Sequence, residues 1–458
     1  MCGLGGWLTW SGQEPEAALL QEMMGLVQHR GPDGQSVLFC SLQDSGQPQA
    51  SPAPDSRWPV ALGHRRLAIV DLSQSGVQPM TNEDGRLWLV FNGEIYNFVE
   101  LRQELLGLGH VFKSRADSEV ILHAYESWGL DMLSKFNGMF ALALWDSRHK
   151  RLVLARDRLG IKPLYFNLTP AGLFFGSELK QFLALPGLQP ALNLALVRDF
   201  LVHGALDHAQ GSLLAGIDQI APGSWLTVDL AGRVKTEAYH PWPEPAPAQD
   251  FSPSERRAAA AKLLALLDEA VGLRLRADVP VGSCLSGGLD SSGVVCLAAD
   301  RLRAAGDEAV TTGPQQHVFT AAYQEPALDE RPFAQMIVQL TSAQPHLVFP
   351  TGAGLFEDLE RLIWHQDGPV DTPSVYAQYK VMDLVAETGI KVTLDGQGAD
   401  ELLGGYAGHH NAYLAQLIRT GRGADFLQEA RGLAAVAGPK EMVRRLAATA
   451  AALGGLQP

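Results

Sequence analysis

The second residue of the chain is a cysteine, and this position gives it a chemistry that internal cysteines lack. If Met1 is removed, Cys2 carries both a thiol and a free α-amine. An α-amine has a reference pKa of about 7.7–8.0, so part of it is neutral at pH 7 and can act as general base for the adjacent thiol. Gly3, Gly5 and Gly6 follow and let a substrate approach the backbone closely. The pattern predicts an N-terminal nucleophile, although a cysteine at position two also occurs in proteins where it has no role.

Four further segments of the first half offer the groups that would bind an amino-acid amide. Arginine can clamp an α-carboxylate, aspartate can pair with an α-ammonium, and an Asn amide with a Gly N–H can hold an oxyanion. Each segment alone is a weak signal, because Asn-Gly is common in hairpin turns and Asp117 at a helix start is often an N-cap. The segments are RGPDG (30–34), HRRL (64–67), NGEIYN (92–97) and ADSE (116–119).

Taken together, the first half resembles a class II glutamine amidotransferase domain through the ordered motifs MCG, RGPDG, HRRLAIVDLS, FNGEIYN, ADSE and ARDRLGIKPLYF. More closely, it resembles the amino-terminal half of the glutamine-hydrolysing asparagine synthetases. The resemblance implies an α+β fold of the N-terminal nucleophile type, a four-layer αββα sandwich, over residues 2–210. It also implies Cys2 as nucleophile, Arg66 for the glutamine α-carboxylate, Asp117 for its α-ammonium, Asn92 and the Gly93 amide for the oxyanion, and Glu94 for glutamine binding.

A second candidate site is the loop SGGLDSS at residues 286–292, which follows a buried strand expected at Val281–Leu285. A helix is expected at Gly293–Leu302, and a glycine loop between a strand and a helix N-terminus presents backbone amides to a phosphate. The serine hydroxyls add donors, and Asp290 can hold a Mg²⁺ ion that bridges phosphate oxygens. The loop is not of the Walker A type, because no Gly-Lys-Ser/Thr is present.

This loop resembles the PP-loop of ATP pyrophosphatases, which cleave ATP to AMP and pyrophosphate. A second glycine-rich loop, LDGQGADELLGGY at residues 394–406, is similar to a segment in the synthetase half of the same family. By this resemblance, Asp290 and Asp400 would neighbour Mg²⁺ or pyrophosphate. The nucleotide-binding residues that it implies are Leu285, Ser286, Gly287, Gly288, Leu289, Asp290, Ser291, Ser292, Ala321, Asp395 and Gly396.

The family resemblance implies a glutamine-dependent ligase whose substrates are glutamine, ATP with Mg²⁺, and a carboxylate acceptor. Ammonia released at Cys2 would convert an adenylated carboxylate, aspartate in the first place, into an amide. Gln397 stands where the family usually has an acidic residue, which favours a different acceptor such as a sugar or peptide carboxylate. Family members also continue beyond the equivalent of Pro458, so we expect the synthetase half to be incomplete at its C-terminus.

Three other interpretations stay open from the sequence. If the incomplete synthetase half is inactive, the chain would be a plain glutaminase, which would release glutamate without consuming ATP. A β-lactam-synthetase-like cyclase is disfavoured, because those relatives use the ATP half without a working glutaminase and this chain has Cys2. A non-catalytic binding protein would lose no activity on replacement of Cys2.

The elements that would position these groups change character along the chain. Short alternating strands dominate the first part, with helices at Pro15–Gln28 and within 97–128, which favours a layered α+β domain. A connecting segment with a proline-rich linker is expected at 211–254. After it, strands alternate with helices over 255–458, which predicts an α/β domain with a doubly wound parallel sheet. The expected strands are Leu87–Phe91, Phe140–Trp145, Leu152–Ala155, Leu164–Phe166, Leu173–Phe175, Val281–Leu285, Val318–Tyr323, His346–Phe349 and Lys391–Leu394, and the first helix of the second part is expected at Ser254–Arg276.

The composition of the chain disfavours two classes of binding partner. Lys and Arg total 36 and Asp and Glu total 50, a net charge of −14 that disfavours nucleic acid and anionic membranes. No run of apolar residues is long enough to span a membrane. The 4 cysteines form no CxxC pair and are expected to be reduced thiols of a cytoplasmic protein. The sequence leaves a homodimer open.

Overall fold

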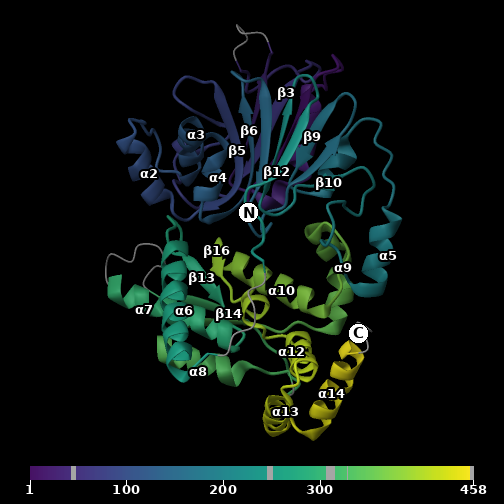
Figure 1. Ribbon diagram of the computed structural model, residues 1–458. Coiled ribbons are helices and arrows are strands. Elements are labelled where there is room, and N and C mark those ends of the chain that lie inside the picture. Colours follow the sequence, from purple (N-terminus) through teal and green to yellow (C-terminus); the bar gives the residue numbers. More distant parts are fainter. Residues whose placement is uncertain (43–47, 245–250, 306–314, 327, 454–458) are drawn as a thin grey trace.

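The computed structural model describes residues 1–42, 48–244, 251–305, 315–326 and 328–453. Figure 1 shows a first half built on antiparallel strands and a second half built on a parallel sheet with helices around it. The N-terminus lies where the two halves meet. In the described part of the chain, no helix has the length and apolar character needed to cross a membrane.

The first sheet begins immediately after Cys2. Its strands pair antiparallel in the order β10-β8-β9-β1-β3-β2. A Cβ on Gly6 would lie 2.0 Å from the Ala61 carbonyl oxygen, so glycine lets β1 approach β3 closely. The strands are β1 (Gly3–Thr9), β2 (Gly34–Cys40), β3 (Val60–Arg66), β8 (Tyr165–Leu168), β9 (Gly172–Gly176) and β10 (Asp218–Gln219).

The second sheet is also antiparallel, with the order β12-β11-β7-β6-β5-β4. Its central pair places Asn92 opposite Ala141 and Gly93 opposite Phe140. The strands are β4 (Met80–Thr81), β5 (Leu87–Ile95), β6 (Gly138–Asp146), β7 (Arg151–Arg156), β11 (Ser224–Asp229) and β12 (Val234–Ala238).

The two sheets face each other across one apolar core, to which Leu4 of β1 and Val90 of β5 contribute. A second core lies between the first sheet and helix α1 (Ala17–Gly25). A third core lies between the second sheet and the helices α2 (Phe98–Gly107), α3 (Asp117–Trp128) and α4 (Met132–Lys135). The order of layers is therefore helix, sheet, sheet, helix, which confirms the αββα sandwich. The remaining helical segments of this half are η1 (Gln28–Arg30), η2 (Gln74–Gly76), η3 (Gly129–Asp131), η4 (Leu179–Ala184) and α5 (Leu194–His203).

The second half contains a parallel sheet with the order β15-β14-β13-β16. Helices α6, α7 and α8 pack apolar side chains on this sheet, and a separate cluster joins it to α10. Strands alternating with helices in this way confirm the α/β domain. The elements are α6 (Pro253–Arg274), β13 (Val281–Cys284), α7 (Leu289–Ala305), β14 (His317–Ala321), α8 (Arg331–Thr341), β15 (Gln344–Val348), α9 (Gly352–Gln366), α10 (Pro373–Glu387), β16 (Val392–Leu394), α11 (Ala399–Leu403), α12 (Ala407–Arg419), α13 (Gly423–Ala437) and α14 (Pro439–Leu453).

The segment 211–254, expected to connect the domains, contains sheet structure. Strand β10 pairs with β8, and β11 pairs with both β7 and β12. Backbone hydrogen bonds therefore tie this segment into the first half, and we propose Ala238 instead of residue 210 as the last sheet residue of that domain. Residues 245–250 of the predicted proline-rich linker lie outside the described residues.

Candidate active sites

The Cys2 thiol lies at the junction of two strands of the first sheet. Its sulfur accepts a hydrogen bond from the backbone N–H of Leu67, at 3.3 Å, directly after β3 ends. The Cys2 carbonyl oxygen accepts a hydrogen bond from Nε of Arg30, at 2.9 Å. These contacts hold Cys2 from both sides without using its amide nitrogen, so removal of Met1 would leave them in place.

Burial dominates the electrostatics at this end of the chain. It lowers the pKa of the Met1 amine to about 5 and raises the pKa of the Cys2 thiol above its usual value. Burial favours the neutral form of an amine, so an amine exposed at Cys2 in the same surroundings would be able to accept a proton. A buried thiol needs such a base, because its proton does not leave readily on its own.

Two buried carboxyl groups lie in the same electrostatic neighbourhood. Asp117, the first residue of α3, accepts a hydrogen bond from the Ile95 N–H at 2.9 Å, and burial raises its pKa to about 6. Burial, together with the negative charge of Asp117, raises the pKa of Glu94 to about 7. The charge of Asp117 also raises the pKa of the Cys2 thiol, and Glu94 acts on the Met1 amine. A cationic group bound here would stabilise the ionised form of both carboxyls.

Strand β5 supplies the predicted oxyanion-binding pair. Asn92 is 1% exposed, and its Nδ2 has no hydrogen-bond partner among the described residues. A buried amide without an acceptor costs free energy, so such a donor is typically reserved for a ligand. A Cβ on Gly93 would lie 2.1 Å from the Met139 carbonyl oxygen, so only glycine fits at this position of the strand.

The structure adds two residues that the sequence analysis did not single out as site residues. Lys162 is buried, and burial lowers its pKa while the charge of Glu94 raises it. The charges of Lys162 and Arg30 also lower the pKa of the Met1 amine. Both residues lie in quoted motifs, so the motifs could have indicated them, but neither residue type alone suggests a role beside a thiol.

The guanidinium of Arg66 is engaged with the backbone. It donates to the Ser73 carbonyl oxygen at 2.9 Å and to the Asp71 carbonyl oxygen. These bonds use only part of its five N–H donors, so others are left for a carboxylate. Arg66 also immediately precedes Leu67, whose N–H binds the Cys2 sulfur, which places it on the same backbone segment as the thiol contact.

The glycine–serine loop of the second half connects β13 to α7, as predicted. The Ser286 hydroxyl lies 3.0 Å from that of Ser291 and accepts the Gly288 N–H at 3.1 Å. Gly287 has a φ of +93°, and a Cβ there would lie 2.9 Å from the Ala334 nitrogen. The loop is thus folded back on the start of α7, where free N–H groups and the helix dipole favour an anion.

The second glycine-rich loop meets the first. A Cβ on Gly396 would lie 2.7 Å from the Ser291 nitrogen, and Asp395 raises the pKa of the Cys284 thiol, an effect second to burial. Both loops follow the carboxyl ends of neighbouring parallel strands, β13 and β16, where α/β sheets bind ligands.

Fewer contacts position the remaining residues of the predicted ATP site. Ala321 is the last residue of β14, and Leu285 donates its N–H to the Phe319 carbonyl oxygen at 2.8 Å, which ties the loop to that strand. Asp290 lies in the first turn of α7, whereas the Asp400 carboxylate packs against Gly405 of its own loop. A carboxylate beside a phosphate loop fits Mg²⁺, which one or two carboxylates and phosphate oxygens typically hold.

Several polar contacts join the two halves. Asp278 accepts the Asp71 N–H at 2.8 Å and donates its own N–H to the Ile69 carbonyl oxygen at 2.9 Å. Asp367, directly after α9, accepts the N–H groups of Leu179 and Lys180. The two halves are therefore in direct contact, which a transfer between two sites would require.

Two family profiles match the chain. One, described as a glutamine amidotransferase domain, matches residues 1–240, and the other, described as asparagine synthase, matches residues 262–454.

Curated relatives match along most of the chain. A protein of Methanocaldococcus jannaschii named putative asparagine synthetase [glutamine-hydrolyzing] 2 is 30% identical over 92% of this chain and 78% of its own length. Amidase chyE of Penicillium rubens is 31% identical over 87% of this chain and 56% of its own length. Asparagine synthetase [glutamine-hydrolyzing] 1 of Bacillus subtilis is 29% identical over 85% of this chain and 56% of its own length. The chain thus spans little more than half the length of the last two relatives.

Among solved structures, the glutamine phosphoribosylpyrophosphate amidotransferase from B. subtilis, complexed with ADP and GMP, is 17% identical. The match has a TM-score of 0.39 and covers 86% of this chain and 90% of that chain.

Proposed function

Since the chain belongs to the family of the glutamine-hydrolysing asparagine synthetases, we propose that it is an amidotransferase that carries ammonia from glutamine to an ATP-activated carboxylate. The observation that carries this proposal is the environment of Cys2. A thiol held by the Leu67 N–H, next to the buried carboxyls of Glu94 and Asp117, suits attack on a bound amino acid.

In the glutaminase step, the amine exposed by removal of Met1 takes the thiol proton as the Cys2 sulfur attacks the side-chain carbonyl of glutamine. Nδ2 of Asn92 and the N–H of Gly93 hold the resulting oxyanion. The C–N bond then breaks, and the nitrogen leaves as ammonia after taking the proton from the amine. Water hydrolyses the γ-glutamyl thioester to glutamate and restores the thiol.

Glutamine recognition uses groups around the thiol. Asp117 pairs with the α-ammonium, and Glu94 adds negative charge on the same side. Arg66 binds the α-carboxylate through the guanidinium N–H groups that the loop of Asp71 and Ser73 leaves unused.

In the synthetase step, the acceptor carboxylate attacks the α-phosphorus of ATP, pyrophosphate leaves, and the carboxyl carbon becomes an acyl-adenylate. Ammonia adds to this carbon and AMP leaves, which gives the amide. The amides and hydroxyls of residues 286–292 bind the pyrophosphate portion, while Leu285, Ala321, Asp395 and Gly396 surround the nucleotide. Mg²⁺, held by Asp290 and Asp400, would neutralise phosphate charge there.

The proposed acceptor is aspartate, which would give asparagine. One observation favours a second candidate: Gln397 lies in the second glycine-rich loop, where an amide has replaced the acidic group typical of the family. An amide cannot accept a proton as a carboxylate can. A sugar or peptide carboxylate is therefore the alternative acceptor.

The test is to measure glutamate and pyrophosphate release with ATP and a panel of acceptor acids, using either glutamine or an ammonium salt as nitrogen source. We expect Cys2→Ala to abolish glutamate release but retain ammonium-dependent pyrophosphate release. Cys296→Ala, a half-buried thiol outside both loops, is the matched control and should keep both activities. Unchanged glutamate release by Cys2→Ala would refute the proposal. Glutamate release without pyrophosphate release for every acceptor would reduce the function to a glutaminase.

A further inference from the structure

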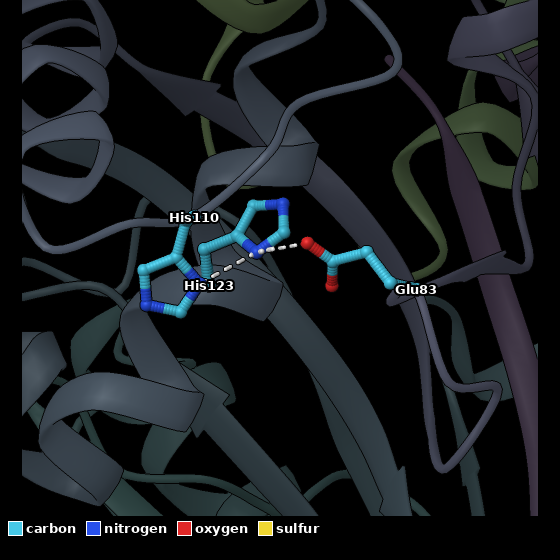
Figure 2. Close-up of side chains that lie close together, drawn as sticks. All are labelled: Glu83, His110 and His123. Atoms are coloured by element: carbon cyan, nitrogen blue, oxygen red, sulfur yellow. Dashed lines mark hydrogen bonds and ion pairs between the residues drawn. The ribbon is translucent and has the colours of Figure 1, made fainter.

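Outside both proposed sites, two histidines and a glutamate meet beside helix α3. Figure 2 shows the side chains of Glu83, His110 and His123 turned toward one another. They come from three separate segments: the turn between β4 and β5, the loop after α2, and the middle of α3. Neither the glutaminase nor the synthetase reaction uses them.

The donor atoms are spaced as they would be around one metal ion. Nδ1 of His110 lies 3.1 Å from Nδ1 of His123, and Oε1 of Glu83 lies 3.7 Å from the same His123 atom. Oε2 of Glu126 lies 3.3 Å from Nδ1 of His123 and 3.7 Å from Nδ1 of His110. Ligands of a tetrahedral zinc, with bonds of about 2.0–2.2 Å, lie about 3.3–3.6 Å from one another.

The surroundings of the two Nε2 atoms allow Nδ1 of each imidazole to be a metal ligand. Nε2 of His110 lies 2.6 Å from the Ser127 hydroxyl, which can accept its proton. Nε2 of His123 is buried and has no hydrogen-bond partner among the described residues, and the Glu119 carboxylate, which can only accept, lies 3.7 Å away. With both protons on Nε2, two Nδ1 lone pairs point at each other among carboxylates. Metal-binding histidines direct the outer N–H to an oxygen acceptor, as His110 does toward Ser127.

We propose that Glu83, His110 and His123 bind a zinc ion, with Glu126 as the fourth ligand. Mixed imidazole and carboxylate donors favour zinc over Mg²⁺ or Ca²⁺, which prefer oxygen alone. The two carboxylates balance the charge of the ion. Oε1 of Glu126 already accepts the Asn82 amide at 2.8 Å, which orients its other oxygen toward the histidines.

Four protein ligands make this a closed, structural site that does not itself perform chemistry. The ion joins the turn before β5 and the loop after α2 to α3. The first residue of α3 is Asp117, so the zinc holds the helix that presents this carboxylate. The proposal stands independently of the reaction catalysed, because it rests only on these ligands.

The test is to titrate the metal-free 458-residue chain with ZnCl₂ alone and to measure binding by isothermal titration calorimetry. It uses a Cys2→Ala background, since a free thiol beside an amine also binds zinc. We expect one zinc per chain and an affinity at least about tenfold lower in Glu83→Gln and His110→Gln. Glu83 is exposed and His110 is half-buried, so both variants should fold. His208→Gln is the matched control, because His208 is an exposed histidine that pairs with Asp199.

Two further measurements make the result decisive. Zinc should raise the melting temperature of the Cys2→Ala protein and of His208→Gln, but not that of His110→Gln. Co²⁺ in place of zinc should give the intense visible absorption of a tetrahedral site. Absence of zinc binding, or binding that Glu83→Gln and His110→Gln leave unchanged, would overturn the proposal and leave a proton shared between the two imidazoles.

Discussion

Glu94 and Asp117 carry buried carboxyl groups, and neither forms a salt bridge with another described residue. Burial raises their pKa values to about 7 and about 6, respectively, and each ordinarily ionises well below that. The ionised forms are therefore costly in the free protein and favourable once a cation is bound. Residues with such shifted pKa values gather at functional sites, because ligand binding compensates for a cost that folding alone does not.

The raised pKa of Glu94 predicts that the stability of the protein depends on pH. The folded protein holds the Glu94 proton up to about pH 7, whereas the unfolded chain releases it near pH 4.5, so the free energy of unfolding falls as pH rises through this window. The contribution of Glu94 is on the order of 3 kcal/mol. In urea denaturation measured from pH 4.5 to 7.5, the free energy of unfolding of Glu94→Gln should fall less with rising pH, because the contribution of Glu94 is removed. Glu104→Gln, an exposed carboxyl, should keep it, and an equal slope in Glu94→Gln would contradict the assignment.

Asn92 predicts an effect on rate instead of binding. Its Nδ2 has no acceptor among the described residues, so its hydrogen bond forms only when the oxyanion develops. Asn92→Ala should lower kcat for glutamate release by about 10²–10³-fold with little change in KM for glutamine. Steady-state kinetics at saturating and limiting glutamine separate the two constants. A rise in KM with unchanged kcat would instead make Asn92 a binding residue for the substrate.

At the scale of elements, apolar runs and glycine-rich loops predicted much of the fold. β5, β6, β7 and the loop between β13 and α7 were expected close to where they lie, because buried strands flanked by turn residues have a distinct pattern. Strand β12 could not be expected, since all of its residues are exposed and no alternation remains. Helix α7 begins at Leu289, which is 88% exposed and gave no signal of a helix start.

The clusters of side chains were harder to predict than the elements. The positions of Cys2, Asn92, Glu94 and Asp117 in motifs indicated the first site, whose individual roles stay predictions. The histidine cluster had no such pattern, because His110 and His123 lie 13 residues apart on different elements. Only tertiary packing brings the two histidines together, and their spacing along the sequence does not reveal such a contact.

Strand β5 predicts a strict requirement for glycine. A Cβ at Gly93 would meet the backbone of β6 at 2.1 Å and 2.7 Å, so the strands would have to separate at the oxyanion-binding position. Gly93→Ala should therefore destabilise the protein by roughly 2–4 kcal/mol, by overpacking and loss of strand pairing, and also abolish glutamate release. Gly107→Ala, with nothing near its Cβ at the end of α2, is the control and should leave stability unchanged or raise it by up to about 1 kcal/mol. Equal melting temperatures for the two variants would contradict this.

At the scale of the whole molecule, a chain of charged contacts runs from Cys2 to the second half. Arg30 donates to the Cys2 carbonyl oxygen and, through Nη1, to Glu178 at 2.8 Å. Glu178 also binds Lys180, whose Nζ lies 3.0 Å from Asp367 after α9. These side chains are mostly buried, so their interactions are only weakly screened by solvent. The backbone that carries the thiol is thus connected to the other half through four paired side chains.

If ammonia passes between the halves, this connection should affect its transfer more than its formation. Asp367→Asn keeps a residue that tolerates the left-handed conformation, with φ of 59°, and keeps one acceptor for the Leu179 and Lys180 N–H groups. It removes the charge that pairs with Lys180.

We expect glutamate release to stay within about twofold of the wild-type rate, because surface and interface changes distant from a nucleophile affect its chemistry little. The ratio of glutamate to pyrophosphate should rise above that of the wild type, since more ammonia escapes. Lys391→Gln breaks another pair between the halves, with Asp33, whose carboxylate is partly exposed, so this control should leave the ratio unchanged. A parallel loss of both products in Asp367→Asn would mean that the contact supports folding alone.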